Sequence, residues 1–121
     1  MPEEKKDNLD EMIAINRELQ NLIDDLDENK KQTEKLTVAD DITQQIYKEK
    51  TDILDELTYY WKGDKANHFL HIAHEDNEHE YKQSMRILDD VHSNLENEQK
   101  ALVHKEEDLL NKQMKLKQET H

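Results

Sequence analysis

The sequence predicts an all-α protein, a long antiparallel two-helix hairpin that resembles a coiled coil, on three observations. The 121 residues contain one Gly and one Pro, too few for a fold with many tight turns. Charged residues make up 39% and hydrophobic residues 33%, a composition typical of long helices. Apolar residues recur at alternating steps of three and four, the spacing of a helix that buries one stripe. We therefore expect a single domain, residues 1–121, with helices at about 5–61 and 65–118 and a turn at 62–64.

The turn is predicted from the only Gly of the chain, Gly63, which lies near its midpoint. Gly reaches positive φ without steric cost and so allows a chain to leave a helix. Asp64 follows directly, and Asp is a favoured N-cap residue for the next helix. If the chain folds back here, position i faces about position 125 − i, which brings Leu36 near Leu88. Apolar residues then meet apolar residues, which favours the hairpin over a single straight rod.

The first helix begins with a regular apolar seam. The seam consists of Met12, Ile15, Leu19, Leu22 and Leu26. It thins through Asn29 and Thr33, and we favour a loosely packed, solvated middle of the helix over the alternative, in which polar seam residues fix the register. From Leu36 the apolar steps run 36, 39, 42 and 46, one residue short of a heptad pattern. This predicts one continuous helix with an irregularity near Thr37, and a break there is the alternative.

The second helix carries the strongest periodic signal, five leucines spaced seven residues apart. They are Leu88, Leu95, Leu102, Leu109 and Leu116. Such a repeat indicates a long helix that turns one side toward a coiled-coil seam.

The residues around the turn are richer in large apolar groups than one seam requires. The group consists of Leu54, Leu57, Tyr60, Trp61, Phe69 and Ile72. A helix turns only one stripe toward its mate, so a two-helix hairpin cannot bury all of them. Exposed clusters of this kind mark interaction sites, and we expect this end of the hairpin to bind a partner helix.

The tripeptide Trp61-Lys62-Gly63 between two helices, followed by Ala66 and Phe69 at helical spacing, resembles the motif of the WXG family. Members of that family are small helical hairpins of type VII secretion systems in Gram-positive bacteria. The long first helix is more similar to the small α-helical proteins encoded beside LXG toxins. That resemblance implies a targeting protein, or chaperone, that binds the toxin's helical N-terminal domain or a second small helical protein and assists export. A homodimer is left open.

The sequence departs from the family in one respect. WXG-type export signals carry Tyr-x-x-x-Asp/Glu after the second helix, and nothing after Leu102 matches. We therefore expect a cytoplasmic protein whose export, if it occurs, depends on a signal shared with its partner. The alternative function is a generic coiled-coil scaffold or oligomerisation module unrelated to secretion.

Composition argues against several other functions. A net charge of −13 argues against nucleic acid and anionic membranes, and no apolar run is long enough to insert into a bilayer. With no Cys and one Gly, the chain offers neither thiolate chemistry nor a phosphate-binding loop, and we expect neither an enzyme nor a cofactor.

The histidines are the one group with metal-binding chemistry. His71, Glu75 and His79 are spaced four residues apart and share a helix face, an arrangement that can supply metal ligands. The first helix offers Lys48, Glu49 and Lys50 opposite, which makes a poor second half of a site. We expect a solvated His/Glu face and no metal.

Overall fold

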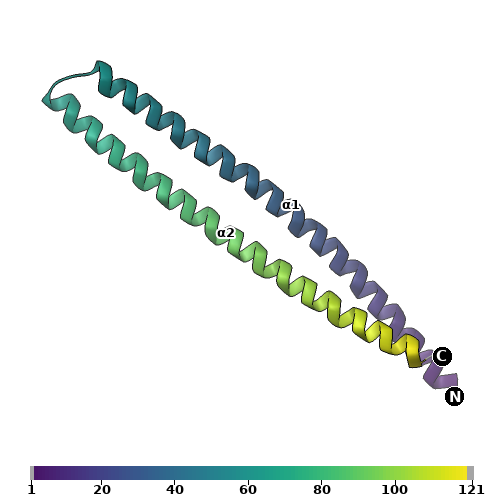
Figure 1. Cartoon of the computed structure of the whole chain (residues 1–121). Helices are drawn as coiled ribbons and strands as arrows, with labels where there is room; N and C mark the ends of the chain where they lie inside the picture. Colours follow the sequence, from purple (N-terminus) through teal and green to yellow (C-terminus); the bar gives the residue numbers. More distant parts are fainter. Residues whose placement is uncertain (1, 120–121) are drawn as a thin grey trace. The chain divides into compact units, whose positions relative to one another are not determined.

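A computed structural model describes residues 2–119, with side chains from Asp7 onward, as two α-helices. Helix α1 spans Pro2–Tyr60 and helix α2 spans Asp64–Glu119. They run antiparallel as a helical hairpin, which confirms the predicted fold class (Figure 1). Neither described helix has a stretch long and apolar enough to cross a membrane.

The hairpin consists of two compact units, each built from a segment of both helices. Within the described residues, the terminal unit combines residues 2–33 with 94–119, and the turn unit comprises residues 34–93. Each unit is described by itself below, because each has its own kind of seam.

The turn occupies residues 61–63, one position earlier than expected. The Trp61 N–H still donates to the Leu57 carbonyl at 2.8 Å, and Gly63 then reverses the chain with φ of 119°. A Cβ on Gly63 would meet nothing within 4 Å, so its φ, and not lack of space, calls for glycine. The Gly63 carbonyl accepts from the Asn67 N–H at 2.9 Å, which makes Gly63 the N-cap residue of α2. The expected N-cap, Asp64, is instead the first helical residue, where its carboxylate faces the positive end of the helix dipole.

The terminal unit has an apolar seam. Ile15 and Leu22 of α1 and Leu109 and Leu116 of α2 form its buried core. Three half-buried residues, Met12, Leu19 and Leu102, pack against this core. The leucines spaced seven apart therefore lie in the seam, as the sequence predicts.

The turn unit continues the same heptad spacing along α1 without a skip. The residues of α1 that are buried or half-buried here are mainly Leu36, Asp40, Thr43, Tyr47 and Leu54. The predicted seam through positions 42 and 46 is wrong, because Ile42 and Ile46 are 55% and 45% exposed. The expected continuous helix is confirmed, since α1 does not break at Thr37. A skip would require local overwinding of the helix. Because α1 is regular and unbroken, its seam keeps the heptad spacing even where this brings polar residues into the seam.

In the turn unit the register of the helices differs from the expected one, by three to seven residues in the contacts of Tyr47 and Asp40. The expected rule places Tyr47 opposite residue 78, yet its ring and hydroxyl contact Tyr81 and Ser84. It places Asp40 opposite residue 85, yet Asp40 pairs with His92. Because leucines repeat every seven residues, apolar residues can meet at more than one offset, and apolar matching alone did not select the right one.

Candidate functional site

An exposed apolar surface surrounds the turn of the hairpin. We call it the turn-end surface, and it consists of Leu57, Tyr59, Tyr60, Trp61, Phe69 and Ile72. Tyr59 and Tyr60 are 73% and 79% exposed, Phe69 is 55% exposed and Trp61 is 46% exposed. Leu57 and Ile72 are exposed as well, whereas Leu54 is half-buried. Five of the six residues come from the group that the sequence singled out, and Tyr59 is an addition.

The surface is positioned by the way α2 begins. Ala66 and Leu70 take the inward positions of its first turns and are each 2% exposed. Phe69 therefore points outward, and its ring packs against the Trp61 ring with centroids 5.5 Å apart and planes tilted by 54°. The pair joins the end of α1 to the start of α2 and stays open to solvent.

The last turn of α1 orders the remaining aromatic side chains. The Lys62 ammonium donates to the Thr58 carbonyl at 3.1 Å and lies 5.9 Å from the centre of the Tyr59 ring. Tyr59 and Tyr60 meet edge to face, with centroids 5.0 Å apart. A lysine on the final carbonyls is a favourable helix ending, so the exposed rings sit on a capped helix.

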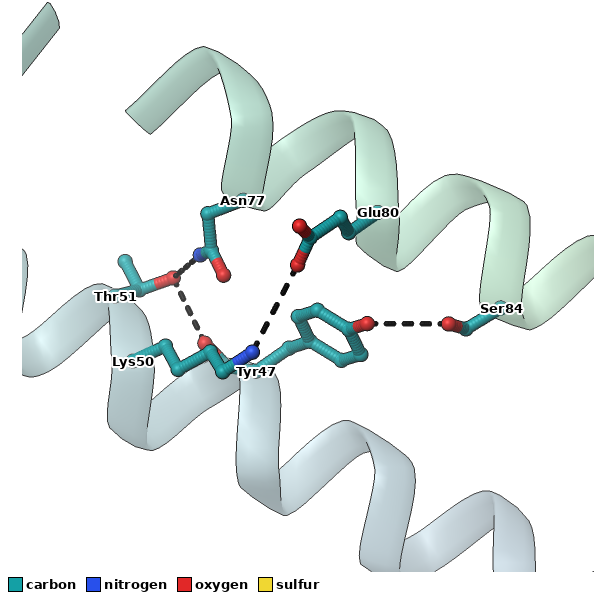
Figure 2. A network of polar contacts seen from close by, with 6 residues as sticks. All are labelled: Tyr47, Lys50, Thr51, Asn77, Glu80 and Ser84. Atoms are coloured by element: carbon teal, nitrogen blue, oxygen red, sulfur yellow. Dashed lines mark hydrogen bonds and ion pairs between the residues drawn. The ribbon is translucent and has the colours of Figure 1, made fainter. Parts of the chain in front are cut away.

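A second feature of the turn unit is a polar stretch of its seam (Figure 2). The Tyr47 and Ser84 hydroxyls are 3.1 Å apart, and the Asn77 side-chain amide donates to Thr51 at 3.0 Å. Lys50 and Glu80 form an ion pair at 3.7 Å on the same stretch. Sequence reasoning missed these contacts because it followed apolar residues. Extending the heptad phase of the first helix would have placed Thr43 and Tyr47 in the seam.

An open groove of about 1180 Å³ lies beside this polar stretch. Both helices line it, and its walls are polar except for the rings of Tyr47 and Tyr81. Five of its lining residues are acidic, and they are Asp41, Glu49, Asp52, Glu75 and Glu78. The Asn77 side-chain oxygen is buried nearby without a hydrogen-bond partner. Such a groove offers hydrogen bonds and negative charge.

The histidines pair with carboxylates one at a time. His71 lies 3.1 Å from Glu75, and His74 lies 3.8 Å from Asp55 on the other helix. Among the side chains that the structure describes, from Asp7 to Glu119, no three His, Asp or Glu residues converge in a way that could hold a metal ion. His79 is exposed and adds no third ligand to His71 and Glu75. The arrangement is therefore a set of solvated pairs.

Comparison with known proteins identifies a family for the chain. A family model described as "Protein of unknown function (DUF3958)" matches residues 10–116, which includes both helices and the turn. No curated protein matches the chain, and no solved structure does.

Proposed function

Because the chain belongs to the DUF3958 family, described only as a protein of unknown function, its role has to be inferred from its own surfaces, and we propose that it is a type VII secretion accessory protein. In this proposal the hairpin binds the helical N-terminal domain of an LXG-type toxin, or a WXG-like partner, and assists its export. It acts as a binding protein and not as an enzyme. It is made in the cytoplasm and reaches the secretion machinery with its partner.

The observation that carries the proposal is the exposure of the Trp61 and Phe69 pair. Both rings are about half exposed while they pack on each other. Large aromatic groups left open to solvent mark interaction sites, and Trp and Tyr are enriched among the residues that contribute most to binding. A partner helix that packs on these rings would bury the exposed aromatic end of the folded hairpin.

The Trp-x-Gly motif supports the choice of partner class. Gly63 reverses the chain and Trp61 precedes it directly after the end of α1, as in the hairpins of the WXG family that the sequence resembles. Those hairpins act by packing against helices of other proteins. The secretion role therefore rests on the motif and its setting, and the binding role rests on the exposed surface.

The test is binding of the N-terminal domain of an LXG-type toxin encoded beside this gene. We expect Trp61→Ala to weaken binding by about 2 kcal/mol or more, as truncation of a central aromatic contact does. Calorimetric titration gives the affinity, and circular dichroism of the same variant gives its helix content. A matched control is Leu110→Ala, because Leu110 is 43% exposed but lies in the terminal unit.

Three outcomes separate the possibilities. Weakened binding with full helix content supports the proposal. Loss of helix content in Trp61→Ala means that Trp61 is a structural plug of the turn. If the wild-type chain does not bind the toxin domain and instead self-associates, the alternative of a coiled-coil scaffold or oligomerisation module takes its place.

A further inference from the structure

A stripe of aliphatic residues on α1 lies outside the seam of the turn unit. It consists of Val38, Ile42, Ile46 and Ile53, which are 57%, 55%, 45% and 57% exposed. An α-helix turns by about 100° per residue, so steps of four, four and seven residues keep these side chains on one side of the helix. The same geometry places that side about 135° away from the seam residues Leu36, Asp40 and Tyr47. Ile46 and Ile53 therefore face sideways, about 100–120° from the seam, and Val38 is at the outer edge of the stripe, about 180° from the seam.

Two of the polar contacts drawn in Figure 2 identify which side of the hairpin this is. Thr51 and Asn77 meet at the edge of the seam that borders the polar groove, since both line it. Lys50 and Glu80 pair at the other edge, and neither lines the groove. Ile46 comes four residues before Lys50 and Ile53 three after it, so the stripe lies on the side of the Lys50–Glu80 pair.

Helix α2 adds apolar residues to this same side. Ile87 follows Glu80 by seven residues, Val91 follows Ile87 by four, and Phe69 precedes Glu80 by eleven, all helical repeats of one face. Phe69, Ile87 and Val91 are 55%, 64% and 40% exposed. We name the combined surface the lateral apolar face, and it consists of Val38, Ile42, Ile46, Ile53, Phe69, Ile87 and Val91. The turn unit thus has one polar side, with the groove, and one apolar side.

The charges around the lateral apolar face indicate what covers it. Exposed acidic residues border it, with Glu56 on α1 and Asp76 on α2. Residues 34–93 hold 14 Asp and Glu against 7 Lys and Arg, a net charge of −7. A second copy of the chain would bring these acidic borders together, and like charges placed opposite each other are destabilising. A helix with basic borders is attracted instead.

We propose that the lateral apolar face binds one amphipathic helix of another protein, with apolar residues in a seven-residue repeat and Lys or Arg on both borders. The stripe from Val38 to Ile53 extends about 23 Å along α1, at 1.5 Å per residue, which corresponds to a partner helix of at least four turns. The proposal rests on the proposed function in one respect, that this helix belongs to the protein bound at the turn-end surface. It assigns the partner's chemistry and a second contact region.

The test uses a synthetic 21-residue helix with Leu and Ile in the apolar repeat and Lys on both borders. A matched peptide has the same apolar repeat with Glu on the borders. Fluorescence anisotropy against the intact chain should show saturable binding of the Lys peptide and at least about tenfold weaker binding of the Glu peptide. Added salt should weaken the Lys peptide, because exposed charges are screened.

A double variant locates the binding site. Ile46→Gln with Ile53→Gln changes exposed positions outside the seam, so helix content should be kept, and binding of the Lys peptide should fall by at least about tenfold. The matched control is Val103→Gln with Leu110→Gln, which are 38% and 43% exposed on α2 in the terminal unit. The control should bind the Lys peptide as the wild type does.

Several results would overturn the proposal. They are equal binding of the two peptides, equal loss of binding in the two double variants, or wild-type self-association in sedimentation velocity that Ile46→Gln with Ile53→Gln abolishes. The last result would make the face an interface between two copies. Failure of the proposed function looks different, because the toxin domain would then not bind while the Lys peptide still does. If the toxin domain binds through Trp61, and Ile46→Gln with Ile53→Gln changes the binding of neither the toxin domain nor the Lys peptide, only the lateral apolar face is refuted.

Discussion

Asn29 of α1 donates from its side-chain amide to the Leu95 carbonyl of α2 at 3.0 Å. The same amide also donates to the Glu98 carboxylate at 3.0 Å. Asn29 is 4% exposed and is the only buried polar residue among those that the structure describes. The interpretation favoured from the sequence, a solvated middle of the helix, is therefore wrong at this position. A polar residue enclosed in a seam stays there only with hydrogen-bond partners, and α2 supplies both.

The first prediction is that Asn29→Leu stabilises the fold and weakens the specificity with which α1 pairs with α2 of the same chain. A buried Asn in a coiled-coil seam specifies register and oligomeric state at a cost in stability. We expect the free energy of unfolding in urea to rise by about 1 kcal/mol, because Leu extends the apolar seam of the terminal unit. We also expect self-association in sedimentation velocity that the wild type lacks at equal concentration.

The control for this variant is Asn21→Leu, an exposed position on the same helix. Its effect on unfolding should stay within about 0.5 kcal/mol. A destabilised Asn29→Leu that remains in the wild-type state of association would show that the two hydrogen bonds stabilise the seam and do not select the partner.

The sequence was sufficient for the fold, because two kinds of signal agreed. The seven-residue leucine repeat required a long helix, and the single Gly63 left one place for the chain to reverse. The register of the turn unit was not predictable to better than one or two helical turns, since the same repeat allows apolar residues to match at several offsets. Contacts such as Tyr47 with Ser84 fix the offset, and they join polar residues that apolar matching ignores.

The candidate site was predictable in part. Trp61 and Phe69 were found by counting the apolar residues near the turn. Both are exposed, as expected where there are more apolar residues than one seam can bury. The lateral apolar face was missed because Ile42 and Ile46 were assigned to the seam. They lie outside it because the heptad phase of the first helix continues through Asp40 and Thr43, which places polar residues inside and isoleucines outside.

The second prediction concerns the hydroxyl pair of Tyr47 and Ser84. Tyr47→Phe removes one partner and leaves the half-buried Ser84 hydroxyl without it, so unfolding should become easier by about 1 kcal/mol. In a double-mutant cycle with Ser84→Ala, the coupling energy should be about 0.5–1.5 kcal/mol. The cycle is measured by urea unfolding of the four proteins. A coupling energy near zero would mean that water replaces the lost partner without cost.

The third prediction separates backbone strain from helix capping at the turn. Gly63→Ala forces a Cβ onto a residue with φ of 119°, where nothing within 4 Å blocks the methyl group itself. The backbone conformation alone should then cost about 1–3 kcal/mol in unfolding free energy. Lys62→Ala removes one exposed hydrogen bond to the Thr58 carbonyl and should cost less than about 1 kcal/mol. Equal effects of the two variants would contradict the assignment of strain to Gly63.

The fourth prediction tests the hairpin itself by chemical cross-linking. The chain has no cysteine, so introduced thiols react without background. Thr51 and Asn77 lie on opposite helices with their side chains 3.0 Å apart. The variant Thr51→Cys with Asn77→Cys should therefore be joined within one molecule by a short bis-maleimide. In the control, Thr51→Cys with Arg86→Cys, the second thiol lies nine residues further along α2, about 14 Å away, and the yield should be low. Mass spectrometry identifies the product, and covalent dimers in place of cross-linked monomers would show that the two helices pair between chains. That result would reject the hairpin in solution, and with it a turn-end surface formed by Trp61 and Phe69 of the same molecule.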